Sequence, residues 1–471
     1  MYKIKQDIYD KPRSPMGPGI FILITLIGIL GGLSYLVIYK GWLGTKPQFA
    51  ILSGVTGQPQ NIATALPASR TLGLSFKIDG QGKNICSVKA DLIQGEQKWS
   101  LFNQNPQQTI VNIKPEVDLS ALGVKPEPLT VHLEARNCSL FKTKNSMTAQ
   151  LAPDFNPPTI GITSQQHYIN QGGADVVTYN VSPDTVWSGV RVGDNQFEGF
   201  DKPNAAAGEK FAFFVYSYNL PANAPITLVA IDGAGNEAKT NLTPARFFPK
   251  EFRQREMPVS DSFISDKIMT IINNTPGRVS KGDPVQDFIQ VNRDLRKKNA
   301  QDLHDFSKQS EKSFLWHDAF IPLKNASVEA GFADYRSYIY NGQKIDEQVH
   351  LGFDLAITEH APVYAAAAGK IMFAGYLGIY GNTILVDHGY GIVTLYAHLS
   401  SMDMAVGNPV EKGQKIGNSG TTGLAGGDHL HFSLLIQGVQ TNPVEFWDQH
   451  WIDDHVYLRL GKEVFLSQAS R

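Results

Sequence analysis

The sequence lacks the charge imbalance that marks nucleic-acid-binding proteins. Its 471 residues include 42 basic and 44 acidic side chains, which gives a formal net charge of -2 and no basic stripe. Binding to a phosphate backbone depends on clustered lysine and arginine. Nucleic acid is therefore excluded as a partner.

The motifs of several common enzyme classes are missing as well. No Gly-x-Ser-x-Gly elbow occurs, and the glycines at 423, 426 and 427 are not followed by the lysine and Ser/Thr of a phosphate-binding loop. The only two cysteines, Cys86 and Cys138, lie far in sequence from the histidine-rich region. Serine, cysteine and P-loop chemistry are set aside.

Uncharged apolar runs are short, with one exception. Ile20–Tyr39 has twenty residues without a charge, which is the length of a membrane-spanning helix. Four basic residues against two acidic ones precede it, and no small-x-small cleavage signal follows. We expect a cytoplasmic N-terminus at residues 1–19 and an uncleaved transmembrane signal anchor at residues 20–39. The remainder would lie outside the cytoplasmic membrane, in the periplasm or the extracellular wall space.

The two cysteines are expected to pair. They are 52 positions apart, and the compartment outside the membrane permits disulfides. On the chain-entropy model such a loop stabilises the fold by about 4 kcal/mol. The alternative is two buried free thiols.

Alternating runs separated by turn residues predict two β modules. Residues 48–152 suggest a small β-sandwich, and Asp154–Pro158 is a stiff linker. Residues 159–246 repeat the style, and Ile226–Ala238 resembles the closing hairpin of bacterial immunoglobulin-like modules. We expect two immunoglobulin-like sandwiches in tandem, which act as spacers and can dock wall polymer or a division partner.

The pattern changes to helix over residues 258–312. Asp283 and Pro284 supply an N-cap and a proline at the first helical position, and an apolar face is marked by Ile264, Ile268 and Ile271. We interpret this segment as a helical connector that braces its neighbours. The alternative is that the helices cover a catalytic groove and gate it.

Five side chains suited to metal binding and proton transfer gather in the C-terminal third: His350, Asp354, His398, His429 and His431. A hydrolytic zinc takes three protein ligands and keeps one position open, and imidazole and carboxylate are suitable donors. Five candidates for three ligand roles leave two for acid/base work.

Hydrophobic alternation places these side chains on strands. Residues i and i+2 of a strand point to one side, which would bring His429 and His431 together. The run from Leu430 to Gln437 predicts a strand with one polar and one buried side. Gly352 disfavours a helix around the first pair, so we expect extended chain there, with both side chains on one side.

The segments around these side chains follow an ordered pattern over about a third of the chain. They are Phe332-Ala-Asp-Tyr-Arg-Ser-Tyr338, His350-Leu-Gly-Phe-Asp354, Pro362–Lys370, Tyr380–Gly389, Leu395–Ser400, Val410–Gly417, Gly420-Thr-Thr-Gly423 and His429-Leu-His431-Phe432. With them, residues 314–451 resemble the lysostaphin-type zinc metallopeptidases of the bacterial cell wall, the family that includes LytM.

The resemblance implies that His350, Asp354 and His431 bind one Zn2+ and that His398 and His429 are the catalytic pair. It implies a compact antiparallel β domain of the duplicated hybrid motif fold at residues 314–455, in a chain that is multidomain and mainly β. The implied reaction is hydrolysis of peptide cross-links in peptidoglycan, with zinc-bound water as the nucleophile. Imidazole suits both the base and the stabiliser of the transition state. We expect His398 to be the base and His429 the stabiliser, and the sequence leaves the reverse assignment open.

A second class of function is a non-enzymatic regulator that binds and activates a cell-wall amidase, since some relatives keep the fold and lose the ligands. The presence of all five side chains favours the enzyme. The sequence leaves open which peptide bond is cut and what the oligomeric state is. Outside the five, His388 is expected to be structural, and contact with substrate is open to Tyr340, Tyr380 and Tyr396.

Overall fold

The computed structural model describes residues 29–32, 35, 45–53, 57–139 and 142–468. Contacts divide the chain into two compact units, residues 1–156 with 233–236, and residues 157–232 with 237–471. The expected membrane anchor at residues 20–39 lies for the most part outside the described residues. Within the described ranges, no helix is both long and apolar enough to cross a membrane.

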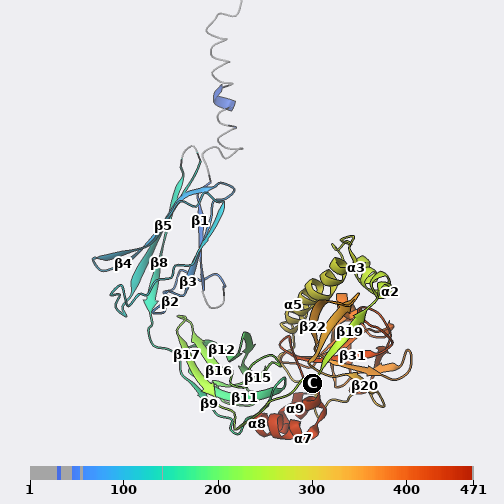
Figure 1. Cartoon of the computed structure of the whole chain (residues 1–471). Helices are drawn as coiled ribbons and strands as arrows, with labels where there is room; N and C mark the ends of the chain where they lie inside the picture. The colour runs from blue at the N-terminus through green and yellow to red at the C-terminus, as the bar shows by residue number, and fades with distance from the viewer. Residues whose placement is uncertain (1–28, 33–34, 36–44, 54–56, 140–141, 469–471) are drawn as a thin grey trace, which may run out of the picture. The chain divides into compact units, whose positions relative to one another are not determined.

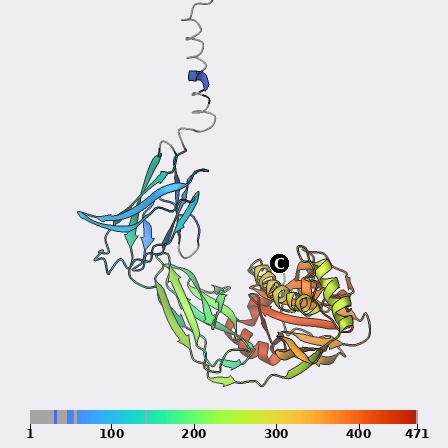
Figure 2. The same ribbon diagram turned by 45° about the horizontal axis from the view of Figure 1, so that its top comes forward.

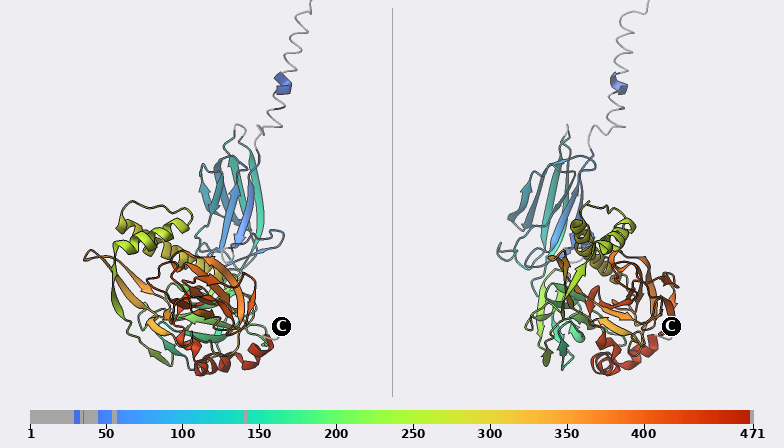
Figure 3. Two further views of the ribbon diagram at one scale, coloured as in Figure 1. Left: turned by 90° about the vertical axis from the view of Figure 1, so that its right-hand side faces the viewer. Right: turned by 45° about the vertical axis from the view of Figure 1, so that its right-hand side comes forward.

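The first unit contains two β-sheets, whose strands are drawn in blue to teal in Figure 3. Their strand orders are β1-β3-β6 and β2-β8-β7-β4-β5. Buried and more exposed side chains alternate along β3 and β7, so each sheet turns one face to a common core. The strands are β1 Gln48–Ser53, β2 Leu66–Ala68, β3 Leu74–Asp79, β4 Ile85–Gln94, β5 Gln97–Gln104, β6 Ile110–Ile113, β7 Leu129–Asn137 and β8 Lys144–Pro153.

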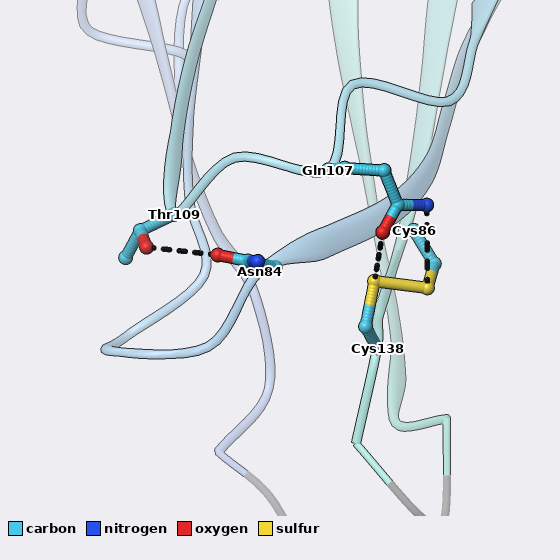
Figure 4. The surroundings of a disulfide bond; sticks show 5 residues. All are labelled: Asn84, Cys86, Gln107, Thr109 and Cys138. Atoms are coloured by element: carbon cyan, nitrogen blue, oxygen red, sulfur yellow. Dashed lines mark hydrogen bonds between the residues drawn. A yellow bond between two sulfur atoms is a disulfide. The ribbon is translucent and has the colours of Figure 1, made fainter.

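A disulfide joins Cys86, in β4, to Cys138, just after β7, as the sequence predicts. The two cysteines are 52 positions apart, and their strands pair in an antiparallel manner. Gln107 lies against the two sulfur atoms, and nearby Thr109 donates a hydrogen bond of 3.2 Å to Asn84 (Figure 4). The disulfide therefore holds together one end of the β4–β7 strand pair in the first unit.

The second unit begins with two four-stranded antiparallel sheets. Their orders are β14-β15-β11-β9 and β13-β12-β16-β17, and a short parallel pair, β10 with β18, lies beside them. The strands are β9 Ile160–Ile162, β10 Tyr168–Asn170, β11 Ala174–Val181, β12 Thr185–Val192, β13 Asn195–Glu198, β14 Phe200–Asp201, β15 Glu209–Val215, β16 Ile226–Asp232, β17 Glu237–Leu242 and β18 Arg246–Phe248.

The C-terminal β domain is built on an eight-stranded antiparallel sheet of order β20-β23-β31-β27-β26-β25-β29, with β32 paired to β31. Its strands are β20 Ser327–Ala330, β23 Phe353–Ala356, β25 Gly369–Tyr376, β26 Asn382–Asp387, β27 Ile392–Ala397, β29 Pro409–Val410, β31 Leu430–Ile436 and β32 Val439–Thr441. Two further sheets, of orders β19-β21-β22 and β24-β30-β28, comprise β19 Gln254–Val259, β21 Asp334–Tyr340, β22 Gln343–His350, β24 Pro362–Tyr364, β28 Ser401–Met402 and β30 Lys415–Asn418.

Helical turns occupy two main segments. Before the β domain come α2 Asp261–Phe263, η1 Ile264–Ile268, α3 Met269–Asn274, α4 Pro284–Ile289, η2 Gln290–Leu295 and α5 Arg296–Ser307, and a short turn, η3 Gly378–Tyr380, lies within it. At the C-terminus come α6 Val444–Trp447, α7 Gln449–Trp451, η4 Ile452–Tyr457, α8 Leu458–Leu460 and α9 Lys462–Gln468. The cap predicted at Asp283 is present, since its side chain accepts a hydrogen bond from Gln286 N.

Both faces of the eight-stranded sheet are covered, as β31 shows. Leu430, Phe432 and Leu434 enter one core, whereas Leu435 enters a second core that the helices at residues 261–307 complete. Figure 2 shows these yellow-green helices over the orange strands. All of β31 is buried. The predicted alternation of an apolar and a polar side is present, but the polar side is buried as well, because the helices cover the side that would otherwise face water.

The helical segment is a layer of the β domain. Its apolar face, with Ile268, Ile271 and Phe288, packs against the same core as Leu395 and Leu435 of the sheet. Removal of the helices would expose those leucines to water. This packing supports the role of a brace and gives the helices a fixed place beside the sheet.

The module at residues 160–248 shares a core with the β domain. Phe211, of β15, has its ring centroid 5.7 Å from that of Phe314 and 5.0 Å from that of Tyr390. The C-terminal helices lie against β11 (Figure 1), where Arg459 contacts the buried carboxylate of Asp175. A continuous apolar contact therefore joins this module to the domain that follows.

Glu445 gives this contact a dependence on pH. Its buried carboxylate accepts hydrogen bonds from Ala174 N at 2.6 Å and from Asn170 Nδ2 at 2.9 Å. Burial raises the pKa of Glu445 from 4.5 to about 7. The folded state thus binds the proton more tightly than the unfolded state, and the resulting stability is present below about pH 4.5 and lost as the pH rises through about 7.

We predict that, as the pH rises from about 4.5 to about 7, the titration of Glu445 lowers the free energy of unfolding by about 1.4 kcal/mol per pH unit. Glu445→Gln does not titrate, so the slope of unfolding free energy against pH, measured with urea from pH 4.5 to 8, should become flatter. Glu359→Gln, at an exposed position, should leave the slope unchanged. Equal slopes for wild type and Glu445→Gln would contradict the assignment.

Candidate metal centre

The five side chains singled out in the sequence line one cavity of about 490 Å³. These side chains belong to separate parts of the chain, which strand pairing brings together. Strand β31 pairs with β23 on one side and with β27 on the other. His350 ends β22, Asp354 lies in β23, His398 follows β27, His429 precedes β31, and His431 lies within β31.

Gly352 lets the chain pass close behind the site. A Cβ at this position would lie 2.6 Å from Phe432 O and 2.7 Å from His431 Cε1, closer than real Cβ atoms come to other atoms. The expected extended chain around His350 and Asp354 is in fact two strands, in different sheets, with Gly352 between them. The two side chains converge even so.

Hydrogen bonds behind the rings determine which ring nitrogens carry protons. His350 Nδ1 lies 3.0 Å from Gly331 O, and because a carbonyl only accepts, Nδ1 is protonated and Nε2 is bare. Ser433 donates its hydroxyl hydrogen to Leu351 O at 2.7 Å, so it accepts from His431 Nε2 at 3.0 Å. His431 Nδ1 is therefore also bare when the ring is neutral.

Three acceptor atoms consequently face one another. Asp354 Oδ1 lies 2.8 Å from His350 Nε2 and 3.0 Å from His431 Nδ1, and the two nitrogens are 2.9 Å apart. Lone pairs this close repel unless a cation lies between them. Ligand atoms of a tetrahedral zinc, each 2.0–2.1 Å from the metal, are about 3.3 Å apart. The donor set and its spacing fit zinc.

Arg336 orients the carboxylate. Its Nη2 donates to Asp354 Oδ2 at 3.0 Å, which leaves Oδ1 to the histidines. Arg336 was missed in the sequence; its place two residues after Asp334, on a strand before the site, was the available signal.

His398 is held as a proton acceptor. Its backbone adopts a left-handed φ of 61°, its N donates to Tyr380 O at 2.9 Å, and its Nδ1 donates to Thr422 O at 2.8 Å. Burial and the nearby rings of His429 and His431 lower the pKa of His398 well below its ordinary value. The neutral ring therefore has a bare Nε2.

His429, unlike His398, favours the protonated ring. Its Nδ1 donates to Gly427 O at 2.9 Å, and its Nε2 lies 3.4 Å from Asp354 Oδ1. Burial disfavours the charged ring, but Asp354 outweighs burial and raises the pKa of His429. With ring centroids 4.9 Å apart, His398 and His429 form an acceptor and donor pair beside the three-acceptor cluster.

Residues far from the histidines in sequence complete the cavity wall. Tyr380 lines it, with its ring centroid 5.6 Å from that of His431. Phe263 and Arg296 enter from the helical segment, and Pro258 from β19. Sequence reasoning missed these three because the parallel pairing of β19 with β21 and the packing of the helices on the sheet are long-range contacts that no local motif marks.

Two tyrosines that the sequence left open as substrate contacts, and His388, do not line the cavity. Tyr396 is buried, and its hydroxyl accepts from Ala366 N at 2.7 Å, while Tyr340 donates to Asp261 outside the cavity. His388 is structural, as expected: its Nδ1 donates to Ala368 O at 2.7 Å, and burial lowers its pKa to about 4.

Comparison with known proteins places the site within one family. A family model described as Peptidase family M23 matches residues 348–443. The DD-carboxypeptidase/endopeptidase Mpg of Neisseria meningitidis serogroup B is 45% identical over 97 residues, which cover 21% of this chain and 22% of Mpg. The peptidoglycan DD-endopeptidase ShyA of Vibrio cholerae serotype O1 is 35% identical over 96 residues, which cover 20% of this chain and 22% of ShyA.

The chain thus spans about a fifth of the length of these curated relatives. Among solved structures, the catalytic domain of lysostaphin from Staphylococcus simulans is 28% identical, with a TM-score of 0.20, and the match covers 31% of this chain and 96% of that one. All five converging side chains lie within the matched residues, and residues 348–443 of this chain therefore form a peptidase family M23 domain.

Proposed function

We propose that this chain is a zinc metalloendopeptidase that hydrolyses peptide cross-links of bacterial peptidoglycan during cell-wall remodelling. The observation that carries the proposal is the cluster of three acceptor atoms beside two further imidazoles in one cavity. The relatives Mpg and ShyA are named for cleavage of DD-peptide bonds, in ShyA those of peptidoglycan, which supports the substrate class.

His350 Nε2, Asp354 Oδ1 and His431 Nδ1 would hold the zinc ion. Zinc held by three protein ligands polarises a carbonyl oxygen and lowers the pKa of water to about 7. The protein contributes the rigidity: Arg336 holds the carboxylate, and Ser433 holds the ring of His431. Ligands oriented in this way need little rearrangement when the cation binds.

His398 and His429 divide the movement of protons between them. His398 accepts the proton of the attacking water at Nε2, because its Nδ1 is committed to Thr422 O. His429 keeps a proton on Nδ1 through Gly427 O, so its Nε2–H can donate to the developing oxyanion or to the leaving amine. Each ring therefore has one nitrogen fixed by the backbone and one available for the reaction.

A regulator that only binds an amidase has no need for metal ligands and imidazoles that are held in fixed orientations. Such a protein requires an exposed surface, whereas His350, Asp354, His398 and His431 are all buried and oriented by hydrogen bonds. A zinc-loaded protein that stimulates an amidase and hydrolyses no peptidoglycan would favour the regulator.

We further propose that residues 20–39 anchor the enzyme in the cytoplasmic membrane, with the catalytic domain in the periplasm or wall space. The support is the uncharged run with its basic flank, together with the Cys86–Cys138 disulfide, which is typical of oxidising compartments. Deletion of residues 1–39 should move the protein from the membrane fraction to the soluble fraction. A full-length protein that is soluble without detergent would contradict the anchor.

His350→Ala should abolish zinc binding and hydrolysis together, because one of three ligands is lost. Zinc content is measured by mass spectrometry of the purified protein, and hydrolysis by release of soluble muropeptides from purified peptidoglycan. His450→Ala is the matched control, since His450 is exposed and outside the cavity, and it should behave as wild type. Wild-type zinc content and hydrolysis in His350→Ala would sink the proposal.

His398→Ala should keep the metal and lose the reaction. Removal of a general base lowers the rate by roughly 10²–10⁴-fold, and the zinc content should stay at one per chain because His398 is not a ligand. The same two assays decide the outcome. Loss of zinc in His398→Ala would instead make this histidine a ligand, and an unchanged rate would remove it from the mechanism.

A further inference from the structure

Arg296 is a cation in the catalytic cavity without a carboxylate partner. Three arginines line the cavity. Arg336 pairs with Asp354 at 3.0 Å, and Arg255 Nη1 lies 3.7 Å from Asp334 Oδ2. In the part of the chain that the structure describes, no carboxylate lies within ion-pair distance of Arg296. A partly buried charge of this kind favours an anionic ligand.

The guanidinium of Arg296 is held in place. Its Nε donates to Asn292 O at 3.0 Å, and its Nη2 donates to Asn292 Oδ1 at 2.8 Å. Asn292 is itself buried and donates to Asp346 Oδ2 at 2.9 Å. An arginine has five N–H groups, so these bonds fix the plane of the group and leave most of its donors free. A head group held in this way loses little entropy when it binds a ligand.

Arg296 lines the same cavity as the reacting groups. Tyr380 lines it too, with its ring centroid 5.6 Å from that of His431 and the two rings tilted by 46°. Arg296 is therefore within the reach of a peptide that has its scissile bond at the histidines.

We propose that Arg296 determines specificity by binding a carboxylate of the peptide substrate. The inference rests on the proposed function and names the substrate class: peptides with a free carboxylate close to the scissile bond. A planar guanidinium binds such a group through two parallel hydrogen bonds, which lysine and glutamine cannot reproduce. Two sources carry this group, a terminal carboxylate of the stem peptide and a side-chain carboxylate of the residue at the cross-link.

The test measures binding without hydrolysis, in a His398→Ala background, by calorimetry with zinc present. The probes are three cross-linked muropeptide dimers: one with all carboxylates free, one amidated at the side-chain carboxylate, and one amidated at the terminal carboxylate. Arg296→Gln should weaken binding of the free dimer about tenfold or more. Amidation of the recognised carboxylate should weaken binding equally, and Arg296→Gln should then add nothing; the dimer that shows this identifies the source.

Lys297→Gln is the matched control, since Lys297 is the exposed neighbour of Arg296, and it should bind as wild type does. Arg296→Lys retains the charge and should recover part of the affinity if Arg296→Gln is poorly folded. An equal effect of Arg296→Gln on all three dimers, or no effect, would overturn the inference. Hydrolysis of the free dimer by wild type is measured in parallel: binding that depends on Arg296 without hydrolysis would refute the proposed function alone.

Discussion

The structure depends on one electrostatic constraint: three acceptor atoms face one another inside the cavity with no hydrogen between them. His350 Nε2, His431 Nδ1 and Asp354 Oδ1 lie within 3.0 Å of one another. The other nitrogen of each ring and the other carboxylate oxygen are hydrogen-bonded to Gly331 O, Ser433 and Arg336. These bonds prevent the side chains from rotating their lone pairs away from one another. A cation between them would convert mutual repulsion into attraction, and the arrangement of the surrounding protein would therefore favour a metal-bound state.

The two apolar cores explain how such a cluster is held. The face of β31 that carries Phe432 and Leu434 joins the core that continues into the preceding module, and the opposite face joins the core under the helices. His431 lies on the opposite face of β31 from Phe432, and the cavity that it lines is lined by residues of the helices as well. The helical segment therefore both stabilises the sheet and supplies Arg296 and Phe263 to the cavity wall.

The side chains of the site could be predicted from the sequence, whereas the long-range packing that surrounds them could not. Side chains at His350, Asp354, His398, His429 and His431 could be grouped because their residue types are those of zinc hydrolysis and their strands alternate. The disulfide followed from the presence of two cysteines. The polar side predicted for β31 is present, but its burial was not predicted, because cover by a distant helix leaves no mark on the strand. Arg336 was missed because its position arises from the long-range pairing of β21 with β19 and β22, and Arg296 was missed because its position arises from the packing of the helices on the sheet; no local spacing records either contact.

Binding of one zinc ion by the three acceptor atoms can be tested with an anomalous difference map, recorded at the zinc absorption edge from crystals of the zinc-loaded protein. We expect one strong peak per chain, about 2.0–2.1 Å from His350 Nε2, His431 Nδ1 and Asp354 Oδ1. A peak bound through His431 Nε2, a peak elsewhere, or no peak at saturating zinc would contradict it.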